Sequence, residues 1–324
     1  MFTVSVVIPV YRAEQTLPDL YRQLCDAMAE ITPAFEIIFV EDAGGDGSWP
    51  IIAELARSDQ RVRGIRMSRN YGQHNALLCG IRAAKHEIVV TMDDDLQHPV
   101  SEIRPMLGAL TPEYDVVYGA PLAEQHGLLR DLASRMTKMA LAGAMGAETA
   151  RNTSAFRVFR TRLREGFSGY RSSSVSIDVL LIWSTTRFTA IKVRHAPRTK
   201  GVSGYTPGKL IRHAANLMTG FSTLPLQIAS LVGFVFVFFG LTVLVYVLAN
   251  YIIRGAAVPG FAFLASIIAI FSGAQLFALG IFGEYLARMH FRSMDRPPYL
   301  VGETVALSEA DAVAAESVSH TIAP

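Results

Sequence analysis

The chain has 324 residues, enough for about two domains, and its composition of 51% hydrophobic and 18% charged residues is more apolar than that of most soluble proteins. The formal net charge of +2 carries little information by itself, and no nucleic-acid partner is expected. Cys25 and Cys79 are isolated, which excludes a disulfide framework or a cysteine-based metal site. Met1–Val10 lacks the basic start and the long apolar run of a signal peptide. A reduced, cytoplasmic setting is therefore expected for the N-terminal part.

Apolar runs alternate with helical patterns over the first third of the chain. Strands are expected at 4–11, 35–40, 62–67 and 88–92, with helices between them at 16–31, 49–58 and 73–85. This alternation predicts an α/β fold with a mainly parallel sheet and right-handed crossovers. A further strand is expected at Val116–Tyr118.

Acidic residues follow two of these strands. Glu41 and Asp42 come after the second strand, and Asp93, Asp94 and Asp95 come after the fourth. In open α/β sheets, ligands bind outside the carboxyl ends of strands, and adjacent carboxylates repel one another. A divalent cation such as Mg²⁺ or Mn²⁺, which prefers oxygen ligands, would relieve that repulsion. A solvated acidic turn is the alternative, and spacing alone weighs the two about equally.

Two segments in the middle of the chain are open to two interpretations. The amphipathic pattern at 127–146 fits an ordinary surface helix, or an interfacial helix on a membrane. The basic, glycine-containing stretch Arg198–Tyr205 fits a clamp on phosphate, or a solvated linker.

Two apolar segments, Ile228–Ala249 and Phe261–Phe282, carry no formal charge. Each would span about 33 Å as a helix, which predicts a transmembrane hairpin within 226–283; a buried core hairpin is the alternative. The outer flanks hold more bases than the connecting loop, so the N-terminal domain and the C-terminal tail are both expected in the cytoplasm, in a multi-pass protein of the inner membrane.

This hairpin sets the expected domain boundaries. Residues 1–206 form the cytoplasmic domain, and 207–225 form an amphipathic juxtamembrane helix. Residues 284–324 form a basic flank and a tail; the acidic, Ala- and Ser-rich part Glu303–Pro324 is expected to be disordered.

Five short segments in chain order resemble the motifs of family 2 glycosyltransferases with the GT-A fold. They are Val7–Tyr11, Phe39–Asp42, Arg69–Gln73, Asp93–Gln97 and Gly283–Tyr285. Together with the hairpin they are similar to the polyprenyl-phosphate glycosyltransferases related to dolichyl-phosphate mannose synthase. The resemblance implies a Rossmann-like, mainly parallel sheet with interfacial helices and a C-terminal two-helix transmembrane hairpin.

The resemblance also implies roles for particular residues. Asp93 and Asp95 match the two acids of the DXD motif and, with Gln97, are expected to hold Mg²⁺ or Mn²⁺. The expected nucleotide-sugar-binding residues are Pro9, Tyr11, Glu14, Asp42, Asn70, Gln73 and Asp94. The expected acceptor-phosphate-binding residues are Arg130, Arg135, Arg157, Arg198, Lys200 and Ser203.

The implied reaction is the inverting transfer of a sugar from a nucleotide-sugar, by family habit a UDP-sugar, to undecaprenyl, decaprenyl or dolichyl phosphate for cell-envelope glycan or lipid modification. A phosphate acceptor is already largely ionised near neutral pH and needs less help from a general base than a hydroxyl does. The chain departs from the family pattern at Ala43, Asn152, Ala155 and Gly204. Because relatives often carry acids near Asn152, Asp178 joins Asp93 and Asp95 as a candidate catalytic residue.

Two other functions stay open at this point. One is a glycosyltransferase with a sugar-hydroxyl acceptor in polysaccharide synthesis, and the other is a non-catalytic scaffold. A homo-oligomer is expected, since glycines in the apolar segments permit close helix packing.

Overall fold

The computed structural model describes residues 2–121, 152–172, 175–196, 224–254, 260–294 and 296–307. The chain forms two compact units. The α/β unit comprises Met1–Leu210 and Asp295–Pro324, and the helical unit comprises Ile211–Met294.

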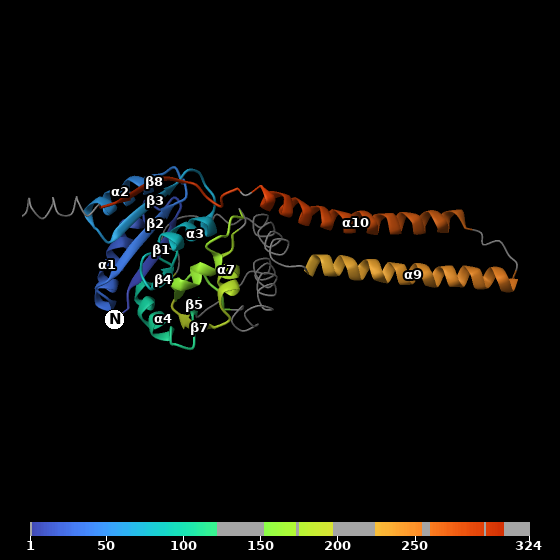
Figure 1. The fold of residues 1–324 in the computed structure, drawn as a ribbon, viewed down its shortest axis with the longest axis horizontal. Coiled ribbons are helices and arrows are strands. Elements are labelled where there is room, and N and C mark those ends of the chain that lie inside the picture. The colour runs from blue at the N-terminus through green and yellow to red at the C-terminus, as the bar shows by residue number, and fades with distance from the viewer. Residues whose placement is uncertain are drawn as a thin grey trace, which may run out of the picture. The chain divides into compact units, whose positions relative to one another are not determined.

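The α/β unit is built around one eight-stranded mixed sheet, with strand order β7-β5-β6-β4-β1-β2-β3-β8 (Figure 1). The strands are β1 Val4–Val10, β2 Phe35–Glu41, β3 Val62–Met67, β4 Ile88–Thr91, β5 Val116–Pro121, β6 Arg157–Arg160, β7 Phe188–Val193 and β8 Val301–Ala306. The central strands β4, β1, β2 and β3 are parallel to one another, which confirms the predicted class of fold. Every residue of β1, β2 and β4 is buried, as expected for strands covered on both faces.

Helices cover both faces of these central strands. The helices of this unit are α1 Leu17–Ile31, α2 Ser48–Ser58, α3 Gln73–Ala83, α4 Ile103–Ala109 and α7 Ile177–Ser184, with 3₁₀ turns η1 Val100–Glu102 and η2 Thr161–Phe167. On one face, the apolar stripe of α1 packs with α2 and with Val6 and Ile8 of β1. On the other face, Gly80 lets α3 approach closely, since a Cβ there would lie 2.4 Å from a methyl group of Val7.

Antiparallel pairing widens the sheet on the β4 side. β6 runs antiparallel to both β4 and β5, and β5 is parallel to β7. The predicted strand at Val116–Tyr118 is confirmed and extends to Pro121. The predicted interfacial helix at 127–146 and most of the predicted juxtamembrane helix, 207–223, lie outside the described residues.

The C-terminal tail differs from the prediction. Val301–Ala306 forms β8, which runs antiparallel to β3 at the edge of the sheet. The expectation of disorder is therefore wrong for residues 303–306. The physical reason is that β3 offers an unpaired backbone edge, and a short segment can add to such an edge by main-chain hydrogen bonds whatever its polarity.

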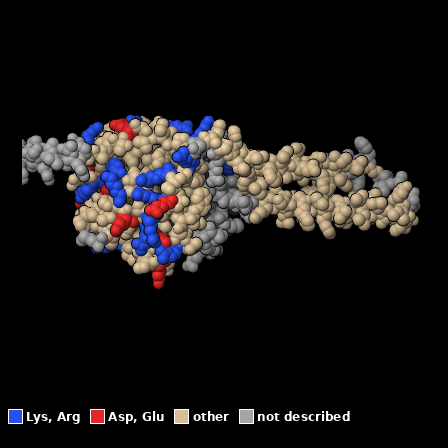
Figure 2. All heavy atoms as spheres, in the orientation of Figure 1, with Lys and Arg blue, Asp and Glu red and all other residues tan. Residues whose placement is uncertain are grey.

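The helical unit contains α9 Leu224–Arg254 and α10 Phe261–Ser293, which pack against each other through a Phe236–Phe271 ring contact with centroids 5.4 Å apart. Within them, Leu226–Ile253 and Ile270–His290 are long and apolar enough to cross a membrane. Large apolar side chains such as Phe234 and Val237 are exposed, and Figure 2 shows the visible surface of α9 free of charged residues. Apolar side chains pointing outward from a two-helix hairpin fit contact with lipid better than contact with water.

Candidate functional site

The candidate site lies where the strand order of the sheet reverses. From β1 the chain builds outward through β2 and β3, then returns to place β4 on the other side of β1. Ligands of open α/β sheets bind outside the carboxyl ends of the strands at such a point. β1 ends directly before Tyr11, and β4 ends two residues before Asp93, so both segments reach this edge.

Backbone strain gathers at the same edge. Arg12, Ala43 and Leu96 have φ angles of 55°, 49° and 60°, and among the described residues they are the only non-glycine residues with positive φ. They follow β1, β2 and β4 within five residues. Each such backbone costs about 1–3 kcal/mol and persists only where its surroundings hold it, which is typical of functional loops.

Asp93 and Asp95 are positioned by different neighbours. The side-chain amide of Gln73 donates to Asp93 Oδ1 at 2.6 Å, and Gln73 is the first residue of α3. The backbone N–H of Gln97 donates to Asp95 Oδ1 at 3.1 Å and so closes a tight turn. The start of α3 and the loop after β4 therefore bring together Gln73, Asp93, Asp95 and Gln97, all of which the sequence predicted for the donor site.

Asp94 turns toward β1 instead. The backbone N–H of Tyr11 donates to Asp94 Oδ2 at 3.0 Å. Burial, reinforced by the charges of Asp93 and Asp95, raises the pKa of Asp94 to about 7, although the Tyr11 hydrogen bond opposes that rise. This carboxylate ties the loop after β4 to the loop after β1, and its contact with a nucleotide-sugar stays a prediction.

Asp42 holds the loop that precedes α3. It is buried, and its two oxygens accept hydrogen bonds from the backbone N–H groups of Tyr71 at 2.7 Å and Gly72 at 2.8 Å. Gly72 has a φ of 92°, a backbone conformation that residues other than glycine rarely adopt. Burial raises the pKa of Asp42, although the hydrogen bonds from Tyr71 and Gly72 oppose that rise. Asp42 thus places Asn70 and Gln73 at the site edge, a structural contribution that the sequence alone did not indicate.

Glu14 and Arg12 join the loops after β1 and β2. Glu14 Oε2 accepts a hydrogen bond from the backbone N–H of Gly47 at 2.8 Å, and Arg12 Nε donates to the carbonyl of Gly44 at 3.0 Å. Glu14 was predicted to bind the nucleotide, and this contact shows it shaping the glycine-rich loop. Pro9 is buried within β1, whereas Tyr11 is 48% exposed at the strand end.

The donor set of the loop after β4 fits a hard divalent cation. Two carboxylates and one amide oxygen, from Asp93, Asp95 and Gln97, lie within five residues, and all three side chains are partly exposed. The negative charges of Asp93 and Asp95 contribute to the raised pKa of Asp94. Among the described residues no group of three or more His, Cys, Asp or Glu side chains could hold a metal, so the amide of Gln97 would have to complete the protein ligands.

Asp178 takes part in a buried ion pair. Arg157 Nε and Nη2 donate to its two carboxylate oxygens at 2.8 and 3.0 Å, and the Tyr118 hydroxyl donates to Oδ1 at 3.0 Å. Burial raises the pKa of Asp178, but the Arg157 guanidinium outweighs it and holds the pKa below its usual range. A carboxylate with both oxygens engaged and a low pKa is a poor proton acceptor. A catalytic role for Asp178 stays a prediction that this arrangement does not favour.

Arg157 is buried at the start of β6, where it pairs with Thr91 at the end of β4. It is 3% exposed, and its Nη1 donates to the carbonyl of Ala155 at 3.0 Å. Its predicted contact with an acceptor phosphate therefore finds no support in the present arrangement. The other predicted acceptor residues, Arg130, Arg135, Arg198, Lys200 and Ser203, lie outside the described residues.

Two histidines near the site were not anticipated. His98 is buried, lies against Phe156 in a tilted arrangement with ring centroids 5.1 Å apart, and meets His195 edge-on with centroids 5.3 Å apart. Burial lowers the pKa of His98 to about 4. The backbone N–H of Ala196 donates to the carbonyl of Gln97 at 2.9 Å, which ties the end of β7 to the loop after β4. The sequence carried no signal for this contact, because nearly one hundred residues separate its partners.

Comparison with known proteins adds to this geometry. A family model described as glycosyl transferase family 2 matches residues 5–168. The undecaprenyl-phosphate 4-deoxy-4-formamido-L-arabinose transferase of Yersinia pestis (strain Pestoides F) is 33% identical over 311 residues, covering 95% of each chain, and the protein of the same name from Yersinia pseudotuberculosis serotype O:3 gives the same values. Among solved structures, glucosyl-3-phosphoglycerate synthase from Mycobacterium tuberculosis in complex with Mn²⁺, UDP-glucose and phosphoglyceric acid is 15% identical, with a TM-score of 0.49 over 67% of this chain and 78% of that chain.

Proposed function

The chain belongs to glycosyl transferase family 2 and is a glycosyltransferase, and from this premise we propose that it transfers a sugar from a nucleotide-sugar to a polyprenyl phosphate. The observation that carries the proposal is the match, over 95% of both chains, to an undecaprenyl-phosphate sugar transferase. The product would be a polyprenyl-phosphoryl-sugar for use in the cell envelope.

The donor side of the reaction rests on the edge formed by the loops after β1, β2 and β4. Tyr11, Asp42 and Gln73 lie on these loops or on segments bonded to them, and they are proposed to line the nucleotide-sugar pocket. The nucleobase is proposed to be uracil. Because Asp94 and Glu14 cross-link the loops, the pocket is shaped before the donor arrives, which reduces the entropy lost on binding.

Asp93, Asp95 and Gln97 are proposed to hold Mg²⁺ or Mn²⁺. A bound cation neutralises the negative charge that the departing nucleoside diphosphate gains. The protein's own part is to fix its carboxylates beside that position, through Gln73 for Asp93 and through the turn at Gln97 for Asp95.

The acceptor is proposed to reach the site from a membrane. α9 and α10 contain two segments of 28 and 21 residues that are able to cross a bilayer. A polyprenyl phosphate would lie with its chain in that bilayer, and its ionised oxygen would attack the anomeric carbon in line with the leaving group, with inversion. The residues proposed to hold the phosphate all lie outside the described part of the chain: Arg130, Arg135, Arg198, Lys200 and Ser203.

The localisation and assembly are part of the same proposal. We place the chain in the inner membrane, with the α/β unit in the cytoplasm. A Cβ on Gly233, Gly273, Gly280 or Gly283 would meet no atom within 4 Å, so these glycines leave open strips on the hairpin that support packing of a homo-oligomer.

The test uses the purified full chain, labelled nucleotide-sugars, a divalent cation and undecaprenyl or dolichyl phosphate. We expect label in the chloroform-extractable lipid, beginning with UDP-4-deoxy-4-formamido-L-arabinose as the donor. Nucleotide binding without product from any donor would favour a scaffold, and label in a water-soluble glycan would favour a hydroxyl acceptor.

A further inference from the structure

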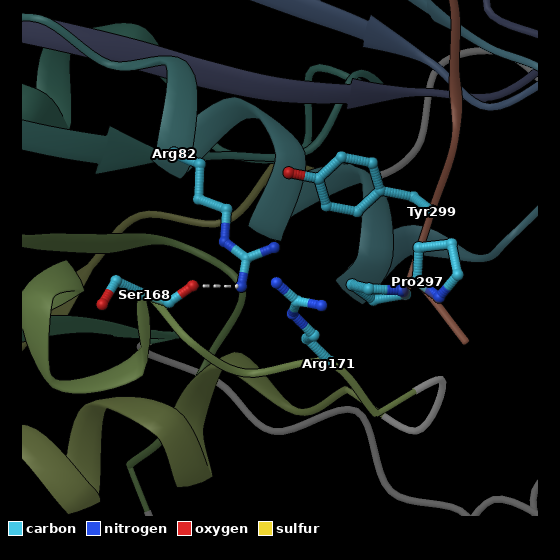
Figure 3. Close-up of a pocket in the computed structure, with 6 residues that line it drawn as sticks. Arg82, Ser168, Arg171, Pro297 and Tyr299 are labelled. Carbon is cyan, nitrogen blue, oxygen red and sulfur yellow. Dashed lines mark hydrogen bonds between the residues drawn. The ribbon is translucent and has the colours of Figure 1, made fainter. Parts of the chain in front are cut away.

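A pocket lies away from the loops after β1, β2 and β4. Its volume is about 420 Å³, in the range of small-molecule sites. Three distant parts of the α/β unit line it: the end of α3, the segment after η2, and the segment that leads from α10 to β8. The lining residues are Arg82, Ser168, Arg171, Pro297, Pro298 and Tyr299 (Figure 3).

Arg82 is fixed in place by backbone groups. Its Nη2 donates to the carbonyls of Ser168 at 3.0 Å and Tyr170 at 2.7 Å, and lies 3.3 Å from the carbonyl of Phe167. Its Nε is buried and makes no hydrogen bond to any described residue. Within the described part of the chain, Arg82 forms no ion pair, so no carboxylate there neutralises its charge.

A second cation faces the same space. In Figure 3 the side chain of Arg171 points toward the guanidinium of Arg82, and Tyr299 and Pro297 line the same space. The Tyr299 ring lies 5.8 Å from the Arg82 guanidinium carbon. A guanidinium group can donate two parallel N–H hydrogen bonds to two oxygens of one phosphate. A phosphate is therefore the anion that Arg82 and Arg171 fit best.

The pocket is distinct from the donor site. Gln73, which bonds to Asp93, begins α3, whereas Arg82 is nine residues further on. At 1.5 Å per residue the two Cα atoms are about 14 Å apart along the helix axis. Reacting atoms must approach to about 3–3.5 Å, so a phosphate held between Arg82 and Arg171 is not in position to react.

Few residues separate one wall of the pocket from α10 along the chain. Pro297 follows Ser293, the last residue of α10, by four residues. Four residues span at most about 14 Å, so this wall of the pocket cannot be far from the end of a helix that is proposed to cross the membrane. A lipid headgroup at the membrane surface is therefore within reach, whatever the angle between the two units.

We propose that the pocket between Arg82, Arg171 and Tyr299 binds a phosphate group carried by a lipid headgroup, in addition to the acceptor lipid. The lipid source rests on the proposed membrane placement; the phosphate chemistry rests on the pocket itself. Such a contact would hold the α/β unit at the membrane surface through a lipid that is not consumed.

The test is native mass spectrometry of the full chain in detergent, titrated with phosphatidylglycerol and, separately, with diacylglycerol, which lacks the phosphate. Arg171→Gln is the decisive variant, because Arg171 is exposed and Arg82 also holds backbone carbonyls. Arg22→Gln, an exposed arginine on α1, is the matched control. We expect Arg171→Gln to weaken phosphatidylglycerol binding about tenfold, Arg82→Gln to weaken it at least as much, and neither to affect diacylglycerol.

A second arm measures the thermal stabilisation of the same proteins by inorganic phosphate. Inorganic phosphate could stabilise the wild type but not Arg171→Gln, while both proteins bind phosphatidylglycerol equally. That result would support a phosphate site in the pocket and would overturn the lipid as the source of the phosphate. Equal binding of phosphatidylglycerol and of phosphate by wild type and Arg171→Gln would overturn the proposal as a whole. No donor sugar is used, so either result is independent of the transfer assay.

Discussion

The three adjacent acids after β4 have separate environments although they share one turn. Asp93 is held by Gln73, Asp95 by the backbone of its own loop, and Asp94 by Tyr11 of the loop after β1. Two of them can thus face a cation while the third braces the loop. The distinction between the outer pair and Asp94 was predicted from the motif resemblance, and the contacts give it a physical basis.

Replacing either outer acid tests the proposed metal site. We expect Asp93→Asn or Asp95→Asn to lower the transfer rate by a factor of about 10² or more, because a neutral amide no longer attracts the cation that offsets the leaving-group charge. Membrane insertion should be unchanged, since α9 and α10 are untouched. The measurements are product formation and Mn²⁺ binding by electron paramagnetic resonance, with Asp19→Asn on α1 as the control. Wild-type rates in both variants would contradict the assignment.

The buried pair of Arg157 and Asp178 offers a choice between structural and catalytic roles. Asp178→Asn leaves the Arg157 charge buried without its partner, so we expect it to reduce the free energy of unfolding by about 3–5 kcal/mol. Replacing both residues with apolar side chains, Arg157→Met with Asp178→Leu, should recover much of that loss. Thermal unfolding of the purified proteins measures both effects. If Asp178→Asn unfolds like the wild type and only its turnover is lost, the role of Asp178 is in the reaction and not in the stability of the fold.

At this scale the sequence could predict candidate metal-binding residues such as Asp93 and Gln97, because they lie close together within one loop. It could not identify pairings such as Arg157 with Asp178 or Asp42 with the Tyr71 backbone. Their partners are 21 and 29 residues apart. Those contacts exist only once the sheet has brought their segments together.

Among the elements, β8 is the one whose contribution to stability is most open to test. Truncation after Leu300 removes β8 and leaves β3 as an open edge, so we expect a lower midpoint of thermal unfolding. Truncation after Leu307 keeps every residue that pairs with β3 and serves as the control. Both proteins are compared with the full chain by thermal unfolding and by transfer rate. Equal midpoints for the two truncations would mean that β8 adds nothing to the fold.

The start of β5 and the end of α7 are joined by Asp115. Its carboxylate accepts hydrogen bonds from Arg187 at 2.8 and 2.9 Å, from Arg162 at 3.0 Å and from Thr185 at 2.8 Å. The Arg187 hydrogen bonds hold the pKa of Asp115 well below its usual range, although burial opposes them. The folded state therefore binds this proton less readily than the unfolded chain.

Asp115→Asn should lower the unfolding midpoint by a few degrees near neutral pH. The contribution of Asp115 is complete above the unfolded pKa of about 3.9 and is lost as the pH falls below it toward the lower folded pKa. The difference between wild type and variant should therefore shrink in acid. Thermal scans from pH 7 down to about pH 3 measure it, with the exposed Glu113→Gln as control. A difference that stays constant over this range would contradict the linkage.

Periodicity was enough to predict the parallel core from β1 to β4 and the helices between its strands, because each apolar stripe there is local. It failed for β8, whose sequence Val301–Ala306 is largely exposed and has no apolar face to indicate a strand. Its existence depends on the free edge of β3, which is more than two hundred residues earlier. Only the three-dimensional pairing reveals such an element.

For the whole molecule, the pairing of β8 with β3 limits how often the chain could cross a membrane. β3 and β8 belong to one sheet, so in a membrane-spanning protein the chain before α9 and the chain after α10 would lie on the same side of the bilayer. An even number of crossings is therefore required, and two candidate spans satisfy it. The strand pairing is independent of the basic flanks, which also predict a cytoplasmic location for both ends.

Cysteine accessibility tests that topology directly. In a Cys25→Ser background, reporter cysteines are introduced one at a time at Gln60 on the α/β unit, at Ala256 between α9 and α10, and at Ser308 after β8. A membrane-impermeant maleimide should label Ala256→Cys in intact spheroplasts. It should label Gln60→Cys and Ser308→Cys only after permeabilisation, because Gln60 lies just before β3 and Ser308 just after β8 along the chain, and these two strands pair. The decisive comparison is between those two: labelling of one without the other in intact spheroplasts would mean that β8 does not pair with β3 in the membrane-bound protein. Labelling of both Gln60→Cys and Ser308→Cys in intact spheroplasts would be consistent with the β3–β8 pairing but would place both positions outside. The orientation predicted from the basic flanks would then be wrong.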